Sequence, residues 1–238
     1  MESRIPKPHF PSPHPQFLTP KPQPLTPVLH AILDADETAR AGWPLVELAR
    51  AFLNGGARFL QVRAKQASSA WLLDASSAVV ALARPLGAVV VVNDRADLAR
   101  VSHADGVHLG QEDLGPAAAR EIVGREALIG LSTHTLEQVD AAVGQPVNYL
   151  AIGPVFGTAT KATGYPAIGL DLVGRAAARA CARGLPLVAI GGITLETVAD
   201  VIGAGASSVA VITDLIVTRD PAARVRAYLD RLSQVSDV

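Results

Sequence analysis

The chain has 238 residues and a formal net charge of −1, and 49% of its residues are hydrophobic while only 4% are aromatic. A chain of this length can form one large domain or two small ones, and a core of Ala, Val, Leu and Ile suits a buried parallel sheet covered by helices. The sequence has no block of like charge and no apolar run near the roughly 18 residues of a membrane span, so we expect neither nucleic acid nor a membrane as a partner.

The single cysteine, Cys181, excludes a disulfide within the chain. This fits a reducing compartment, and we expect a cytoplasmic protein. Cys181 lies in a predicted helix, where we expect it to pack rather than to react. The N-terminus lacks the apolar region of a signal peptide. The oligomeric state stays open, and a homo-oligomer is compatible with the sequence.

Residues 1–27 differ from the rest because they are dense in proline and have no hydrophobic period. Proline interrupts helices, and so little apolar surface cannot form a core. We expect a disordered or extended tail, with a polyproline docking ligand as the alternative. Residues 28–238 are expected to form one domain.

From Val28 onward, short apolar runs alternate with helical patterns. The expected strands are 28–34, 59–63, 88–93, 106–109, 128–131, 149–152, 187–190 and 208–212. The expected helices are 44–53, 68–84, 97–101, 116–123, 136–143, 172–183, 195–204 and 221–232. Eight such parallel units in one domain predict an α/β fold, a closed (β/α)₈ TIM barrel. A doubly wound open sheet is the alternative, weakened because no Gly-x-Gly-x-x-Gly follows the first strand.

In such a barrel the active site lies at the carboxyl ends of the strands. Polar residues or glycines stand there after seven consecutive strands, in the segments 61–65, 93–94, 110–113, 132–134, 153–161, 191–192 and 212–214. Side chains alternate along a strand, so Gln61, Arg63 and Lys65 are expected to point together into the barrel mouth.

The charged candidates indicate an anionic ligand. Arg63, Lys65 and Lys161 would repel one another in one mouth unless an anion lay between them. Asp94 and Asp113 follow neighbouring strands, and one or two carboxylates plus substrate phosphates describe a Mg²⁺ site. The alternative is that these carboxylates only form salt bridges with the cations.

A second anion site is expected where this fold usually binds phosphate, after the seventh and eighth strands. Gly191 and Gly192 stand after the seventh strand. The sixth strand runs into residues 153–161, a loop rich in glycine, threonine and one lysine that reads as a flexible anion-binding segment. Two anion sites suggest two phosphorylated small-molecule substrates.

Two histidines have open roles at this stage. His108 is either a core or a rim residue, and His134 is expected to cap the helix that follows it. The sequence contains no Ser-His-Asp order, no Cys-His pair and no histidine-rich cluster of the zinc type. We therefore expect no nucleophile activated by a base.

Six blocks now stand out, in the order QVRAK at 61–65, VND at 92–94, ADGVHLGQED at 104–113, STH at 132–134, GPVFGTATK at 153–161 and AIGGI at 189–193. With them, residues 28–232 resemble the thiamine phosphate synthase family. That family consists of (β/α)₈ barrel transferases that join 4-amino-2-methyl-5-(diphosphooxymethyl)pyrimidine to a thiazole phosphate and release diphosphate. The resemblance implies the same coupling here.

The resemblance also assigns roles residue by residue. The pyrimidine diphosphate would be held by Gln61, Arg63, Lys65, Asn93, Ser132 and Lys161, of which Arg63, Lys65, Ser132 and Lys161 would be catalytic. Mg²⁺ would be bound by Asp94 and Asp113. The thiazole phosphate would be held by Thr158, Thr160, Gly192, Ile212 and Thr213. The family often has Glu at position 64 and Ser at position 213; Ala64 is expected to face away from the mouth, and Thr213 keeps the hydroxyl.

Two other functions remain to be compared with this one. A related thiazole tautomerase shares the barrel but needs no diphosphate-bound metal. A barrel without activity could bind thiamine precursors as a sensor. The intact set of Asp94, Asp113 and Lys161 argues against both, because an idle site has no reason to keep cations that repel one another.

Overall fold

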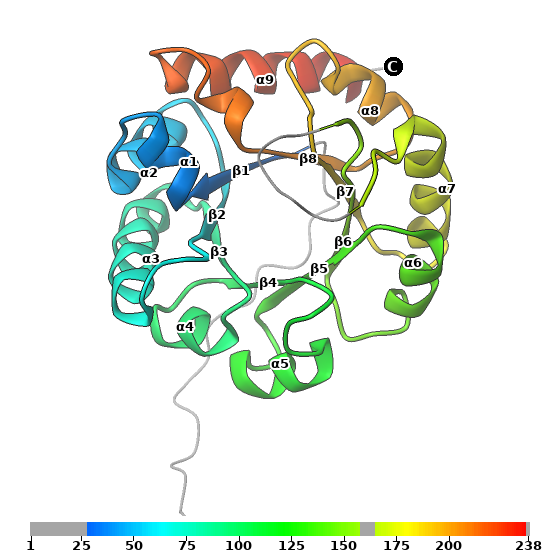
Figure 1. Cartoon of the computed structure of the whole chain (residues 1–238), viewed down its shortest axis with the longest axis horizontal. Helices are drawn as coiled ribbons and strands as arrows, with labels where there is room; N and C mark the ends of the chain where they lie inside the picture. The colour runs from blue at the N-terminus through cyan, green and yellow to red at the C-terminus, as the bar shows by residue number, and fades with distance from the viewer. Residues whose placement is uncertain (1–27, 158–164, 237–238) are drawn as a thin grey trace, which may run out of the picture.

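The computed structural model describes residues 28–157 and 165–236. Its eight strands form a closed parallel barrel in chain order, and the helices surround it (Figure 1). The strands are β1 Val28–Asp34, β2 Phe59–Arg63, β3 Val89–Asn93, β4 Gly106–Leu109, β5 Leu128–Thr133, β6 Tyr149–Ile152, β7 Leu187–Ile190 and β8 Ser208–Val211. This confirms the predicted (β/α)₈ barrel and excludes the open sheet. The predicted tail, residues 1–27, lies outside the described residues.

The helices follow the strands as the sequence predicts, with one addition. They are α1 Ala35–Arg40, α2 Leu45–Asn54, α3 Ser69–Ala83, α4 Ala96–Val101, α5 Pro116–Val123, α6 Leu136–Ala142, α7 Gly169–Cys181, α8 Val198–Gly203 and α9 Pro221–Ser236, with short 3₁₀ turns η1 Arg84–Leu86 and η2 Thr213–Leu215. None of the helices in the described ranges is long and apolar enough to span a bilayer.

Helix α1 is the element that the sequence did not predict. It begins directly after β1, where the Asp34 side chain accepts a hydrogen bond from the Glu37 amide at 3.2 Å. A side-chain acceptor of this kind satisfies one of the free amides at a helix start. With six residues, α1 is too short to show an apolar period.

Two further expectations need correction. Cys181 is exposed at the end of α7, so it does not pack as predicted. Helix α8 begins at Val198 rather than at residue 195. The Thr194 amide instead donates to the Thr197 hydroxyl at 3.0 Å, and this local side-chain bond competes with a regular helical turn.

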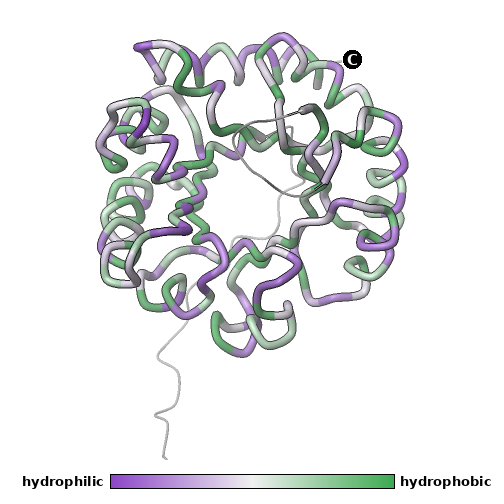
Figure 2. The backbone as a smooth tube through the Cα atoms, in the orientation of Figure 1, coloured by the Kyte–Doolittle hydropathy of each residue, from purple (hydrophilic) through white to green (hydrophobic). Residues whose placement is uncertain are grey.

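Two apolar layers hold the barrel. One fills the space between strands and helices, and Ala64 packs against it, as strand alternation predicts. The other, smaller cluster lies inside the barrel and consists of Ile32, Phe59, Val91, Tyr149, Ala151, Val188 and Ala210. Figure 2 shows hydrophobic residues in the strands of the ring and hydrophilic residues recurring along the surrounding helices. The inner cluster closes the barrel below the carboxyl ends of the strands, which leaves that end for polar groups.

Candidate active site

A cavity of about 1170 Å³ opens at the carboxyl ends of the strands. Its walls include the predicted residues Gln61, Arg63, Lys65, Asn93, Asp94, Asp113, Ser132, Gly192, Ile212 and Thr213. The structure therefore brings together ten residues that are far apart in the sequence. The remaining three, Thr158, Thr160 and Lys161, lie outside the described residues.

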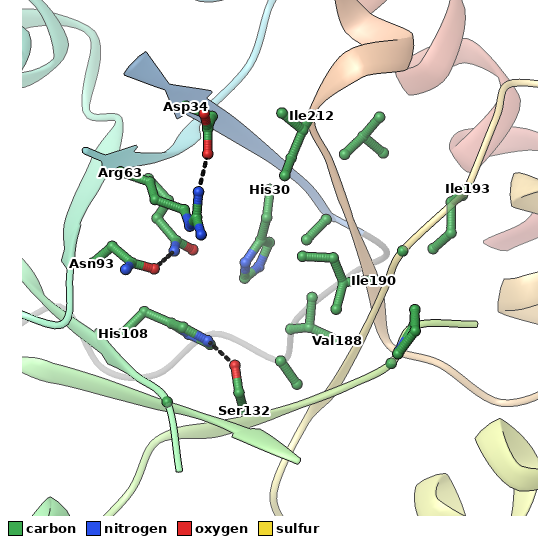
Figure 3. Close-up of a pocket in the computed structure, with 18 of the residues that line it drawn as sticks. His30, Asp34, Arg63, Asn93, His108, Ser132, Val188, Ile190, Ile193 and Ile212 are labelled. Carbon is green, nitrogen blue, oxygen red and sulfur yellow. Dashed lines mark hydrogen bonds and ion pairs between the residues drawn. The ribbon is translucent and has the colours of Figure 1, made fainter. Parts of the chain in front are cut away.

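A buried amide pair forms one wall of the cavity. The Gln61 Nε2 group of β2 donates to Asn93 Oδ1 of β3 at 2.7 Å, and Figure 3 shows Asn93 near Arg63. The pair fixes both amides while Gln61 Oε1 and Asn93 Nδ2 keep hydrogen-bonding capacity for a ligand. Two oriented polar groups on a rigid wall suit the recognition of a polar heterocycle.

Arg63 is held by a carboxylate that the sequence analysis missed. Asp34, at the end of β1, lies opposite Arg63 in the strand register and forms an ion pair with it (Figure 3). The Asp34 side chain is only 3% exposed, and it also caps α1. The spacing of His30, Ile32 and Asp34 along β1 is the signal that could have found it, because these residues alternate toward the barrel interior just as Gln61 and Arg63 do.

The two predicted metal ligands lie close together beside Lys65. Lys65 Nζ is 2.8 Å from Asp94 Oδ2, so the salt bridge that the sequence analysis kept as an alternative does form. The Asp113 carboxylate accepts from the Gly110 amide at 2.7 Å. Burial, and next the hydrogen bond with Asp113, raise the pKa of Asp94, while Lys65 opposes this shift. A bound cation would stabilise the charged form of Asp94, which burial and the neighbouring carboxylate disfavour.

This pair fits Mg²⁺ better than a metal that needs a complete protein shell. Among residues 28–157 and 165–236, no group of three or more His, Cys, Asp or Glu side chains is placed to hold a metal ion. Mg²⁺ is commonly bound by one or two carboxylates together with waters and substrate phosphates. Asp94 and Asp113 could supply those two carboxylates at the mouth of the cavity. The salt bridge to Lys65 engages one oxygen of Asp94.

Ser132 ends a buried chain of hydrogen bonds. Tyr149 Oη lies 3.0 Å from His108 Nδ1. His108 Nε2 in turn lies 2.8 Å from Ser132 Oγ, a contact that Figure 3 marks. Burial raises the pKa of Tyr149, so its hydroxyl keeps its proton. His108 Nδ1 is its hydrogen-bond partner among the described residues, so Tyr149 donates there. We therefore assign the ring proton to His108 Nε2, which donates a hydrogen bond to Ser132 Oγ.

This arrangement bears on the expectation that no nucleophile is activated by a base, because Ser132 and His108 do form a hydrogen bond. They are paired, but the tautomer set by Tyr149 makes His108 a donor toward Ser132. A general base would need a free lone pair on Nε2. The proton of the Ser132 hydroxyl is instead directed away from His108. His108 proves to be both a core and a rim residue, because it is 7% exposed and also lines the cavity.

His30 lies at the floor of the cavity and was also missed. Its ring stacks on Phe59 with centroids 3.7 Å apart and an interplanar angle of 13°. Its Nε2 atom has no hydrogen-bond partner among the described residues. Burial lowers the pKa of His30 to about 3, and repulsion from His108, which acts when both rings are protonated, adds to this shift, so the His30 ring is neutral at physiological pH. A neutral, stacked ring gives the cavity a flat aromatic floor.

His134 does not cap α6, contrary to the prediction. Thr135 is the capping residue, and its hydroxyl accepts from the Gln138 amide at 3.3 Å because its extended backbone places the side chain over the helix start. His134 Nδ1 instead lies 2.5 Å from the Gly153 carbonyl oxygen. Its ring stacks on Tyr165 with centroids 3.9 Å apart. His134 thus fixes the rim of the cavity between β5 and β6.

The expected phosphate end of the cavity follows β7 and β8. Gly191 and Gly192 have φ angles of 99° and 66°, which favour glycine. A Cβ atom on Gly192 would lie 2.7 Å from the Gly157 carbonyl oxygen, so a side chain there would collide with the loop after β6. Gly192 is therefore required by the packing of two loops, whatever it binds. Thr213 begins η2 on the opposite side of this end.

Comparisons with known proteins agree with this geometry. A family model described as thiamine monophosphate synthase matches residues 29–215. A thiamine-phosphate synthase from Koribacter versatilis is 44% identical over 208 residues, which cover 86% of this chain and 95% of the relative. Another from Methanospirillum hungatei is 39% identical over 195 residues, covering 82% and 93%. The solved structure of a thiamine phosphate pyrophosphorylase from Pyrococcus furiosus matches with a TM-score of 0.79 and 29% identity, covering 89% of this chain and 98% of that one. The chain belongs to the thiamine monophosphate synthase family and, like its relatives, is a transferase.

Proposed function

We propose that this enzyme joins 4-amino-2-methyl-5-(diphosphooxymethyl)pyrimidine to 4-methyl-5-(2-phosphooxyethyl)thiazole, giving thiamine phosphate and diphosphate. The observation that carries the proposal is the single cavity with two distinct ends. One end gathers Arg63, Lys65, Asp94 and Asp113, and the other is formed by the turns after β7 and β8. Two phosphorylated substrates can meet in such a cavity.

The pyrimidine is proposed to lie against the buried amide pair. Gln61 and Asn93 would form hydrogen bonds with its ring nitrogens and amino group. The Ser132 hydroxyl would donate a hydrogen bond to the substrate, because its oxygen, and not its proton, is engaged by His108. The aromatic floor formed by His30 on Phe59 suits the flat ring. This placement directs the diphosphate of the same substrate toward the charged end.

The diphosphate is proposed to lie between Arg63, Lys65 and the carboxylate pair. Arg63 and Lys65 would donate to its oxygens, with Lys161, which is outside the described residues, as a third cation. Asp94 and Asp113 would hold Mg²⁺, which when bound supplies positive charge to the diphosphate oxygens. Before the diphosphate binds, the salt bridge to Asp94 holds the Lys65 ammonium beside the carboxylate pair.

The thiazole phosphate is proposed to lie at the opposite end. Gly192, Ile212 and Thr213 would contact its phosphate from the turns after β7 and β8, the usual phosphate position in this fold. Thr158 and Thr160 are proposed to complete the site from the segment outside the described residues. Phosphate at this end would place the thiazole nitrogen toward the middle of the cavity.

The proposed chemistry is dissociative. The carbon–oxygen bond to diphosphate breaks first, and the pair of electrons leaves with the diphosphate. The pyrimidine methylene cation that remains is stabilised by its amino group, and the thiazole nitrogen then forms the new carbon–nitrogen bond. Arg63 and Lys65 assist by stabilising the charge that develops on the departing oxygens. Ser132 acts as a donor rather than a nucleophile, because His108 cannot take its proton in the tautomer described above.

The experiment that tests this function is a diphosphate-release assay with both substrates and Mg²⁺, together with detection of thiamine phosphate. We expect equal amounts of the two products, and neither product when the thiazole phosphate is replaced by buffer. A thiazole tautomerase would convert its substrate without diphosphate release. A precursor sensor would bind both compounds and release nothing. Either of these results would overturn the proposal.

A further inference from the structure

A partly buried ionic cluster lies beside the proposed thiazole phosphate end, and none of the roles above uses it. Its centre is Asp214, the second residue of η2, whose side chain is 13% exposed and lines the cavity. One carboxylate oxygen, Asp214 Oδ2, accepts three hydrogen bonds. The donors are the Leu195 amide at 3.1 Å, Arg224 Nη2 at 2.7 Å and the Tyr228 hydroxyl at 2.5 Å.

The donors come from different parts of the barrel. Leu195 lies in the loop after β7, three residues beyond Gly192. Arg224 and Tyr228 lie one helical turn apart on α9. Arg224 Nε also donates to the Asp214 carbonyl oxygen at 3.2 Å, so the guanidinium holds both the backbone and the side chain of Asp214. The cluster therefore fastens the turn after β8 to the loop after β7 and to the closing helix.

Tyr228 strengthens the connection to the loop after β7. Its side chain is fully buried, and its hydroxyl also lies 3.4 Å from the Ile193 carbonyl oxygen. Burial, and next the hydrogen bond to Asp214, raise the pKa of Tyr228, so it remains a donor at physiological pH. Ile193 follows Gly192 directly, and Asp214 follows Thr213 directly. The cluster is thus one residue away from a proposed phosphate contact on each side.

The charge of Asp214 is unexpected beside a phosphate. A carboxylate at this end of the cavity would repel the ligand if its only effect were its charge. The pairing with Arg224, whose side chain is 16% exposed, balances that charge inside the protein. Because the ion pair is neutral overall, it does not attract the phosphate. Its role is better explained as fixing the geometry of the turns around the ligand.

We propose that Asp214, together with Arg224 and Tyr228, is a positioning residue for the phosphate of the thiazole substrate. It holds the turns that carry Gly192 and Thr213 at the separation that the phosphate requires. This inference rests on the proposed function of that end of the cavity. The proposed function requires the phosphate to bind between the turns after β7 and β8. The further proposal concerns which residues set the distance between those turns.

The test compares Asp214→Asn and Tyr228→Phe with the wild-type enzyme. Misplacement of about 1 Å can cost on the order of 100-fold in such sites, and we expect Asp214→Asn to raise KM for the thiazole phosphate by about 10- to 100-fold. KM for the pyrimidine diphosphate should stay within about twofold, since distant sites act independently. Tyr228→Phe removes one of three donors, and its effect should have the same direction and a smaller size.

Asp230→Asn is the matched control, because Asp230 is an exposed aspartate of the same helix outside the cluster. It should leave both KM values unchanged. A merely structural role would lower the melting temperature and leave the ratio of the two KM values unchanged, and that result overturns the proposal. A role through charge alone would lower KM for the thiazole phosphate in Asp214→Asn, which overturns it as well. If Asp214→Asn does not fold, Tyr228→Phe decides by the same criteria.

Calorimetric titration of the wild-type chain and both variants with the thiazole phosphate separates this inference from the function itself. We expect weaker binding in the variants, in proportion to the change in KM. If the wild-type chain binds the thiazole phosphate but forms no product, the proposed coupling fails and the titration still tests the cluster. Equal affinities in all three proteins would overturn the inference while leaving the coupling reaction in place.

Discussion

Replacing Tyr149 by Phe tests whether the buried chain of hydrogen bonds controls the Ser132 hydroxyl. The change removes the donor to His108 Nδ1 and keeps the aromatic ring that packs in the barrel interior. A buried acceptor without its donor costs about 1–3 kcal/mol. In a domain of this size each kcal/mol lowers the melting temperature by about 2–4 °C, so the variant should melt about 2–12 °C lower.

The effect on catalysis should depend entirely on Ser132. Without the Tyr149 donor, the His108 ring proton is free to move to Nδ1, and His108 then stops donating to Ser132. We expect kcat/KM of Tyr149→Phe to fall, but by no more than in Ser132→Ala. If Ser132 donates one hydrogen bond to a charged or polarised group, Ser132→Ala should lose about 10- to 150-fold, which corresponds to 1.5–3 kcal/mol.

Steady-state kinetics of the double variant supply the decisive comparison. In the Ser132→Ala background, Tyr149→Phe should change kcat/KM by less than about twofold while the melting temperature still falls. Fully additive losses in kcat/KM would refute the proposed chain. A loss near 10⁶-fold in Ser132→Ala, as expected for a nucleophile, would refute the donor role of Ser132 itself.

Further variants probe the carboxylate pair, the N-terminal tail and the phosphate end of the cavity. Asp94→Ala or Asp113→Ala should abolish coupling while the fold survives, and full activity that still requires metal would place the ligands elsewhere. Because the pKa of Asp94 is raised, the folded chain holds the proton of this carboxyl more tightly than the unfolded chain does. Without added metal, the free energy of unfolding should therefore fall as pH rises above about 4. Urea titrations of Asp94→Asn should show a weaker dependence on pH. Deleting residues 1–26 should leave coupling intact, and a folded but inactive product would show that the tail takes part. Gly192→Val should raise KM for the thiazole phosphate more than for the pyrimidine diphosphate, because the side chain would collide with the Gly157 carbonyl oxygen and valine disfavours a positive φ. A larger rise in KM for the pyrimidine diphosphate would mean that the two substrates have been assigned to the wrong ends of the cavity.

The sequence predicted the barrel because its signals are local. Strands such as 106–109 and 187–190 are short apolar runs bounded by turn residues, and their limits match the structure. The rim residues were also predictable, since parallel strands all end at one side of a barrel. Helix α1 was not, because it depends on a side-chain cap and carries no apolar period.

The partners of the rim residues could not be predicted, because they depend on register and on contacts between distant segments. Asp34 meets Arg63 only because their strands pair at those positions. The hydrogen bonds from His108 to Tyr149 and Ser132 span 41 and 24 residues. The cluster around Asp214 needs the closing helix to be in place. The sequence therefore located the chemistry of the cavity, and the packed barrel determined which groups are neutralised, oriented or fixed.

Intact-protein mass spectrometry after incubation with the pyrimidine diphosphate and Mg²⁺, in the absence of thiazole phosphate, tests most directly the central claim that coupling proceeds without a covalent enzyme intermediate. We predict an unmodified mass for the wild-type chain and, in parallel initial-rate measurements with both substrates varied, sequential kinetics. A pyrimidine adduct on Ser132, or ping-pong kinetics, would contradict it, because either would mean that the chain forms a covalent intermediate.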